Sequence, residues 1–182
     1  MRRLLALLCL ATIAWAKLPR QLANVPIETP DHRNIDLRKF RGKIVMVVLF
    51  LTDCDDCVDM INFASKLETQ YASRGFQVVG AALNDAAPYE VAPFVQRYRP
   101  TFPIGFLRKD GLIKFADLSP QGHPVAPIIM FIDGLGVVRF EWQGHDVQLK
   151  QKEKLFPAII LGLINQRDRH QEPERVTEPV KR

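Results

Sequence analysis

Two runs, a continuous apolar one over residues 44–51 and a largely apolar one over 76–83 that includes Gln77, dominate the pattern of the chain. Neither run alternates with polar residues, so each predicts a strand that is buried on both faces of a sheet. Between the runs, apolar residues recur at helical spacing as far as the stop signal Arg74-Gly75. The order strand, helix, strand with short connections predicts a βαβ unit with parallel strands, and hence an α/β fold. The helical face consists of Cys57, Met60, Ile61, Ala64, Leu67 and Tyr71.

Five further elements follow the second apolar run. Two of them are strands joined by Asp133-Gly134, and this dipeptide predicts a β-hairpin because Asp-Gly is a favoured hairpin turn. Pro157 interrupts the apolar stripe of the last helix, so we expect that helix to start late or to kink there. The five elements are helices over 88–97, 112–118 and 155–164 and strands over 128–132 and 137–142.

The first sixteen residues have the three-part pattern of a secretory signal peptide. Arg2 and Arg3 supply a positive start, an apolar run covers residues 4–14, and the stretch over 14–16 is a small-x-small cleavage site. The apolar run is shorter than the roughly 20 residues that span a bilayer. We therefore predict export to the periplasm or the cell exterior, with an uncleaved membrane anchor as the alternative.

Composition agrees with one packed domain behind this signal. The chain has 182 residues, of which 47% are hydrophobic and 25% are charged, as is typical of a globular protein. Its net charge of +5 is spread along the chain without a basic block that interleaves with aromatics, so nucleic-acid binding has no support. Residues 167–182 are charged and almost lack core formers, which predicts a flexible tail. The expected organisation is a signal peptide over 1–16, a domain over 17–166 and a tail over 167–182.

Export changes the meaning of the three cysteines. Cys9 lies inside the signal and leaves with it, and Leu8 before it argues against lipid attachment at this position. The mature chain then holds Cys54 and Cys57, in a compartment where disulfides persist. A bridge between them closes a tiny loop, and such bridges stabilise a fold little because loop-closure entropy grows with loop length. We therefore interpret the pair as chemical rather than structural.

The position of the pair favours thiol–disulfide exchange. Cys54 lies where a buried strand passes into a helix, and the free N–H groups and partial positive charge of a helix N-terminus stabilise a thiolate. Cys57 lies one helical turn further on, close enough to attack a mixed disulfide held by Cys54. A C-x-x-C motif beside a βαβ pattern is a thioredoxin-like signal. This chemistry needs no cofactor other than the redox-active Cys54–Cys57 disulfide.

Other uses of the thiols stay open at this stage. A zinc site would need a second cysteine pair or two closely spaced histidines, and the chain has neither. A copper carrier could use Cys54, Cys57 and His123, because thiolates and imidazole suit copper, and the place of His123 in the fold would decide this. Two inert buried thiols are the remaining alternative. The histidines are His32, His123, His145 and His170.

Four short segments give the chain a family resemblance between about Val25 and Asp146. They are Arg41-Gly42-Lys43, the Cys54–Cys57 motif, Val79-Gly80, and Val125-Ala126-Pro127 ahead of Ile132-Asp133-Gly134. With them the chain resembles the TlpA/ResA-like thioredoxins, within the redoxin and thiol-specific-antioxidant superfamily. The resemblance implies a thioredoxin-like fold, with a central mixed sheet flanked by helices, and a thiol:disulfide oxidoreductase. It also implies a cis bond at Pro127 and a substrate-docking backbone at Ala126.

The chain departs from the usual frame of that family around its cysteines. Asp53 stands where tryptophan is usual, and Asp56 stands where proline is frequent. The peroxiredoxin branch would need the pattern P-x-x-x-T-x-x-C, but Leu51 lies three residues before Cys54. A peroxiredoxin-like antioxidant enzyme is therefore kept only as an alternative to disulfide exchange.

Four aspartates crowd the motif, namely Asp53, Asp55, Asp56 and Asp59. Each negative charge disfavours a thiolate and should raise the pKa of Cys54, against the opposing effect of the helix dipole. A destabilised thiolate favours the disulfide, which predicts a reducing protein. The alternative is that the aspartates form a solvated rim and cap the helix. The expected partners are a protein client and an upstream electron donor, with membrane contact only through a retained signal.

Overall fold

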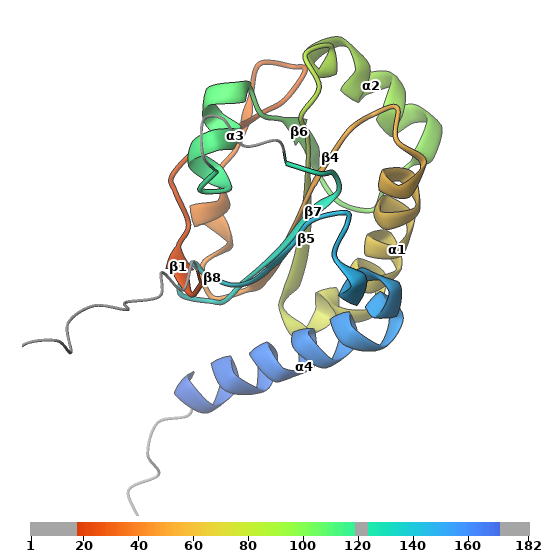
Figure 1. The fold of residues 1–182 in the computed structure, drawn as a ribbon. Coiled ribbons are helices and arrows are strands. Elements are labelled where there is room, and N and C mark those ends of the chain that lie inside the picture. Colours follow the sequence, from red (N-terminus) through yellow and green to blue (C-terminus); the bar gives the residue numbers. More distant parts are fainter. Residues whose placement is uncertain (1–17, 119–123, 172–182) are drawn as a thin grey trace, which may run out of the picture.

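The computed structural model describes residues 18–118 and 124–171. Within these ranges, strands form one mixed sheet in the order β1-β8-β7-β4-β5-β6-β2-β3. The sheet is flanked by helices, as the α/β prediction requires (Figure 1). The strands are β1 (Arg20–Gln21), β2 (Ile27–Glu28), β3 (Asn34–Ile35), β4 (Ile44–Phe50), β5 (Phe76–Ala82), β6 (Ile104–Phe106), β7 (Ile128–Ile132) and β8 (Val137–Trp142). The helices are α1 (Asp55–Tyr71), α2 (Ala87–Tyr98), α3 (Lys109–Phe115) and α4 (Lys152–Gln171), with short 3-10 turns η1 (Leu37–Phe40), η2 (Ala72–Arg74) and η3 (Val147–Gln151).

Strand β4 is the centre of the sheet. It runs parallel to β5, from the pair Ile44–Phe76 to the pair Phe50–Ala82, and antiparallel to β7 on its other side. Every residue of β4 is buried, which confirms the interpretation of its unalternating sequence. The predicted βαβ unit is therefore β4, α1 and β5, and the predicted hairpin is β7 and β8.

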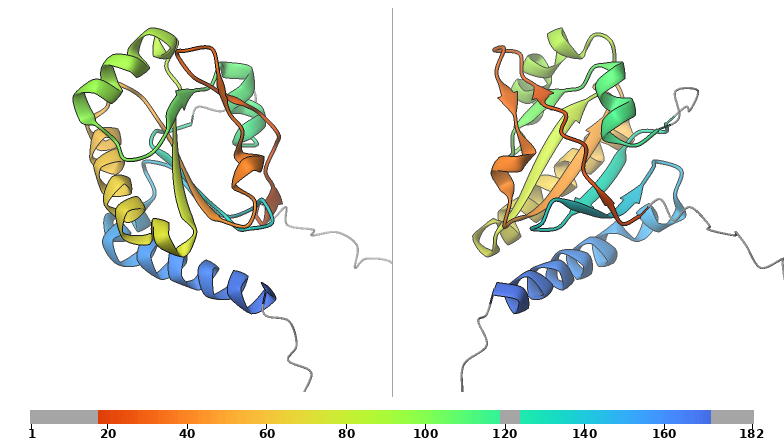
Figure 2. Two further views of the ribbon diagram at one scale, coloured as in Figure 1. Left: turned by 180° about the vertical axis from the view of Figure 1, so that it is seen from behind. Right: turned by 90° about the vertical axis from the view of Figure 1, so that its left-hand side faces the viewer.

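The side chains of β4 divide the core into two layers. Met46, Val48 and Phe50 pack with α1, α2 and α4, whereas Val45, Val47 and Leu49 pack with α3, η1 and the N-terminal segment. This alternation follows from the pleat, which turns successive side chains to opposite faces. Figures 1 and 2 show α1 and α3 on opposite sides of the sheet. The six residues of the expected helical face of α1 are all buried.

The C-terminal helix differs from its prediction at both ends. It begins at Lys152, ahead of Pro157, so it does not start late. It continues through Gln171, although the tail was expected from residue 167. The physical reason is the Arg167 guanidinium, which donates to the carbonyl oxygens of Arg74 at 3.0 Å and Gly75 at 3.3 Å. These contacts tie the last turns of α4 to the rest of the domain.

One predicted helix has different bounds in the structure, and some predicted features lie outside the described residues. The helix expected over 112–118 is α3, which begins at Lys109 and ends at Phe115. The proposed signal peptide and residues 172–182 lie outside the described residues, as does His123. Among the described helices, none is both long enough and apolar enough to cross a membrane.

One acidic side chain is buried between α1 and β5. Glu68 is 8% exposed and accepts hydrogen bonds from the Val78 backbone N–H at 2.5 Å and from Gln77 Nε2 at 2.8 Å. Burial raises the pKa of the Glu68 carboxyl, and the Val78 N–H and the charge of Lys43 oppose this rise only in part. A buried carboxylate of this kind makes folding depend on pH.

We expect the free energy of unfolding to fall as pH rises above the ordinary glutamate value of 4.5. In that window the native state holds a proton on Glu68 that the unfolded state has lost, so ionisation favours unfolding. Glu68→Gln should flatten this fall in urea unfolding curves measured between pH 4.5 and 7. Glu153→Gln is the control, because Glu153 is exposed and its pKa is lowered, so it titrates below this window. Equal slopes in wild type and Glu68→Gln would contradict the assignment.

Candidate active site

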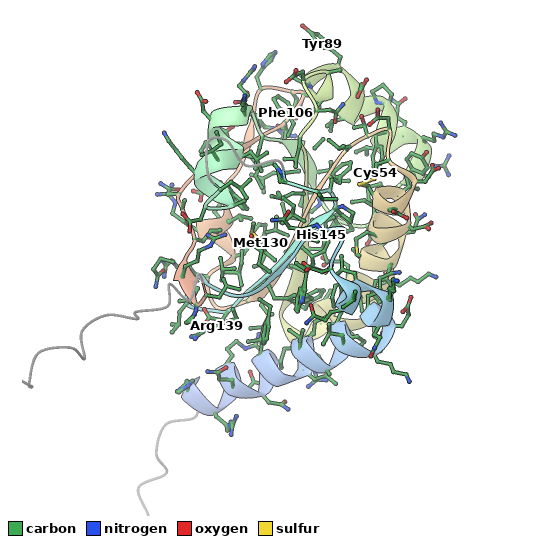
Figure 3. All side chains as sticks on the ribbon, viewed as in Figure 1. Cys54, Tyr89, Phe106, Met130, Arg139 and His145 are labelled. Atoms are coloured by element: carbon green, nitrogen blue, oxygen red, sulfur yellow. A yellow bond between two sulfur atoms is a disulfide. The ribbon has the colours of Figure 1, made fainter. Side chains whose placement is uncertain are left out.

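A disulfide joins Cys54 and Cys57 at the junction of β4 and α1, with their Cα atoms 5.1 Å apart. The loop over 51–53 leads from β4 to Cys54, and α1 begins directly after it at Asp55. Figure 3 shows Cys54 at the start of α1. The strand ends at Phe50, and α1 starts at Asp55 because Cys54, which has an extended backbone conformation, caps the helix.

The two sulfurs have different surroundings. Cys54 is the N-cap residue of α1, and its Sγ accepts a hydrogen bond from the Cys57 backbone N–H at 3.2 Å. Cys54 is partly exposed, whereas Cys57 is 0% exposed and packs in the core layer under α1. A sulfur at an N-cap meets free N–H groups and the positive end of the helix dipole. The arrangement leaves Cys54 as the sulfur that solvent can reach.

The segment before β7 lies at the same end of the sheet. The Ala126–Pro127 peptide bond is cis, as the family resemblance implied. Ile128, the next residue, pairs with Leu49 near the end of β4. Pro127 therefore lies beside the strand end from which the chain continues to Cys54.

A tight turn after β8 supports this cis-proline segment. The Val125 backbone N–H donates to Gln143 Oε1 at 3.1 Å, and the Gly144 N–H donates to the Val125 carbonyl at 2.9 Å. A side chain at position 144 would collide with the Ala126 carbonyl oxygen, which explains the glycine there. Asp146 closes the turn by accepting from the Gln143 N–H at 2.6 Å.

The four aspartates all lie on the surface around the disulfide loop. Asp53, Asp55, Asp56 and Asp59 are exposed, and within the described ranges none of them forms an ion pair. Asp55 and Asp56 occupy the first turn of α1, where negative charge interacts favourably with the helix dipole. Solvent screens much of their effect on the neighbouring sulfur.

Sequence reasoning missed a polar ring beside the disulfide loop. Thr52 in the loop, Asn84 after β5 and Glu90 in the first turn of α2 are joined by hydrogen bonds. Thr52 and Asn84 each follow one of two neighbouring parallel strands, so both reach the same edge of the sheet. The sequence could have indicated this pair, because Thr52 and Asn84 follow the two predicted parallel strands and the carboxyl ends of such strands commonly carry functional residues.

The described part of the structure contains no set of ligands for the alternative metal site. Among residues 18–118 and 124–171, no group of three or more histidine, cysteine, aspartate or glutamate side chains could hold a metal ion. His123, the third ligand in the copper hypothesis, lies outside those ranges.

Comparison with known proteins places these features in a family. The profile of the Redoxin family matches residues 21–118. ResA, a thiol-disulfide oxidoreductase of Bacillus thuringiensis subsp. konkukian, is 24% identical over 136 residues, which cover 75% of each protein. The ResA of Oceanobacillus iheyensis is 30% identical over 117 residues, or 64% of this chain and 58% of the relative.

Solved structures agree on the fold. The crystal structure of a thiol:disulfide interchange protein of the thioredoxin family from Chlorobium tepidum TLS superposes with a TM-score of 0.65 at 22% identity, covering 80% of this chain and 97% of the other. The thioredoxin domain of a thiol-disulfide oxidoreductase from Bacteroides vulgatus gives 0.58 at 16% identity, covering 74% and 95%. The thioredoxin-like fold is therefore confirmed. With the family profile covering more than half of its length, the chain belongs to the Redoxin family, in its TlpA/ResA-like thioredoxin group, and is a thiol:disulfide oxidoreductase.

Proposed function

We propose that the protein reduces disulfides in protein clients, with Cys54 as the attacking cysteine and Cys57 as the resolving cysteine. The contrast between the two sulfurs carries this proposal. Cys54 is partly exposed at the N-terminus of α1 and accepts the Cys57 N–H, whereas Cys57 is fully buried. A client disulfide can approach the sulfur of Cys54. The buried sulfur of Cys57 can attack only the mixed disulfide that the client then forms with Cys54.

The exchange takes place in two balanced steps. The Cys54 thiolate attacks one sulfur of the client disulfide, forms a mixed disulfide and expels the other client sulfur as a thiolate, which takes up a proton. Cys57 then loses its proton and attacks Cys54 Sγ, so that the Cys54–Cys57 disulfide forms and the first client sulfur leaves as a thiolate, which takes up a proton in turn. Two electrons pass to the client. An upstream dithiol donor restores the reduced pair by the same chemistry in reverse.

The cis-proline segment is the proposed docking edge for the client. Pro127 lies beside the end of β4, and Ala126 is partly exposed next to it. The bonds from Val125 to Gln143 and Gly144 hold the backbone of this segment in one conformation. A preformed backbone edge can bind an extended client chain through its main-chain groups, whatever the client's side chains are.

The acidic rim, formed by Asp53, Asp55, Asp56 and Asp59, supports the proposal that the protein acts as a reductant. Negative charges near Cys54 destabilise its thiolate, hence the reduced form, and lower the reduction potential. Because the four aspartates are exposed, we propose a moderate effect rather than a large one.

We expect equilibration with glutathione to give a potential below about −180 mV, nearer thioredoxin's roughly −270 mV than DsbA's roughly −120 mV. The double variant Asp53→Asn/Asp56→Asn should raise it by about 10–20 mV, because it removes screened charges that oppose the thiolate. Asp110→Asn, in the first turn of α3 on the other face of the sheet, is the matched control and should leave it unchanged. A wild-type value above about −180 mV would contradict the reducing assignment.

Cys57→Ser should trap clients as mixed disulfides, because the second step then lacks its nucleophile. Covalent complexes should appear in nonreducing gels of extracts and disappear on reduction. Cys54→Ser is the matched control and should trap nothing. Equal trapping by Cys54→Ser would show that the roles of the two cysteines are reversed or shared.

We also propose that the mature protein is exported and begins at Lys17. The charged start, apolar run and small-x-small site over 1–16 support this proposal. In a host with two membranes, the protein recovered by osmotic shock should have an N-terminal sequence that starts with Lys17-Leu18. Recovery from the cytoplasm with Met1 intact would refute export, and an intact Met1 in the membrane fraction would instead indicate an uncleaved anchor.

A further inference from the structure

We infer that Glu90 is a positioning residue for disulfide exchange, which acts through Thr52 to hold the loop that carries Cys54. The inference rests on the proposed role of Cys54 and concerns residues outside the C-x-x-C motif. Its basis is the polar ring of Thr52, Asn84 and Glu90, which joins three separate elements at one end of the sheet.

The ring is closed and each of its groups has a defined role. Glu90 Oε2 accepts from both Thr52 Oγ1 and Asn84 Nδ2. Asn84 Nδ2 also donates to Thr52 Oγ1 at 2.8 Å, and Asn84 Oδ1 accepts from the Thr52 backbone N–H at 3.3 Å. Thr52 therefore donates its hydroxyl proton to Glu90 while its lone pairs face Asn84. Glu90 forms no ion pair among the described residues, so its carboxylate is held by these two donors alone.

The ring acts where the sheet no longer holds the chain. The last backbone bond of this edge runs from the Leu83 N–H to the Phe50 carbonyl at 2.9 Å. Beyond it, the described hydrogen bonds of the loop over 51–53 all pass through Thr52. Thr52 lies two residues before Cys54, so the ring is the polar tether between the end of β4 and the reactive sulfur.

Helix α2 gives this tether a fixed anchor. Glu90 stands in its first turn, and the helix is packed into the core through Ala87, Val91 and Phe94. Asn84 is fixed as well, because its carbonyl accepts the Ala87 N–H at 2.9 Å at the start of α2. A side chain on a rigid helix can hold a loop in one geometry better than another loop could.

The consequence concerns how readily the two thiols form their disulfide. Intramolecular closure depends on how often Cys54 Sγ lies in line with Cys57, and orientation of this kind is worth large effective concentrations. The ring coexists with the closed disulfide, so it holds the loop in the geometry that closure requires. Loosening the polar ring should lower the effective concentration of the Cys54 thiol relative to the Cys57 thiol. This effective concentration is measured as the equilibrium constant for oxidation of the two thiols by glutathione disulfide.

The test is this equilibrium constant, measured at 25 °C for the full folded chain. Thr52→Val and Glu90→Ala should each lower it about ten-fold, which corresponds to a rise in potential of about 30 mV. The double variant should be no worse than the more affected single variant, because either change breaks the same ring. Thr52→Ser and Glu90→Gln should recover most of the loss, since each keeps the oxygen that the ring needs.

Glu153→Ala is the matched control, because Glu153 occupies the first turn of α4 as Glu90 does of α2 but is exposed and pairs with Lys152 instead of Thr52. It should leave the constant unchanged, and urea unfolding should show that every variant is folded. Additive losses in the double variant would overturn the inference. So would a loss in Glu90→Gln equal to that in Glu90→Ala, because charge rather than hydrogen bonding would then be responsible.

The same samples separate this inference from the proposed function. If the wild type exchanges with glutathione while Thr52→Val and Glu90→Ala match it, the positioning role fails and the proposed function stands. If the wild-type pair does not exchange at all, the proposed function fails and the inference fails with it.

Discussion

The burial of β4 on both faces is the constraint on which the rest of the structure depends. All seven of its residues pair with β5 on one side, the five from Val45 to Leu49 also pair with β7 on the other, and the side chains of β4 pack into both core layers. A strand held in this way has no freedom to slip, because a shift by one residue would exchange its two buried faces. The end of β4 is therefore a fixed point, and the disulfide, the cis-proline segment and the polar ring are all arranged around it.

At the end of β4 the protein places one buried cysteine sulfur beside one that is partly exposed. Cys57 is packed inside the core under α1, whereas Cys54 caps the helix at the surface. Thiol–disulfide exchange uses this asymmetry, since one cysteine must be accessible to the client and the other must react only with the mixed disulfide. Asp53, Asp55, Asp56 and Asp59 surround this pair on the exposed surface, and under our proposal their charge lowers the reduction potential.

Much of this could be predicted from the sequence, and what could not has a physical reason. The buried runs and the helical face of α1 are local patterns, so β4, α1 and β5 were predicted correctly. The Cys54–Cys57 pair was found because its residues are three apart. The polar ring was missed because Thr52 and Asn84 meet only through strand register. The end of α4 was missed because its charged residues suggested a tail, whereas Arg167 docks on carbonyl oxygens of another segment.

The central claim is that Cys54 is the reactive cysteine and Cys57 the protected one. The most direct measurement is alkylation of the fully reduced protein with limiting iodoacetamide, followed by peptide mass spectrometry at early times. We expect Cys54 to be modified at least about ten times faster than Cys57, because Cys54 is partly exposed whereas the thiol of Cys57 is buried in an apolar environment. Equal rates, or faster modification of Cys57, would contradict the assignment of the two sulfurs.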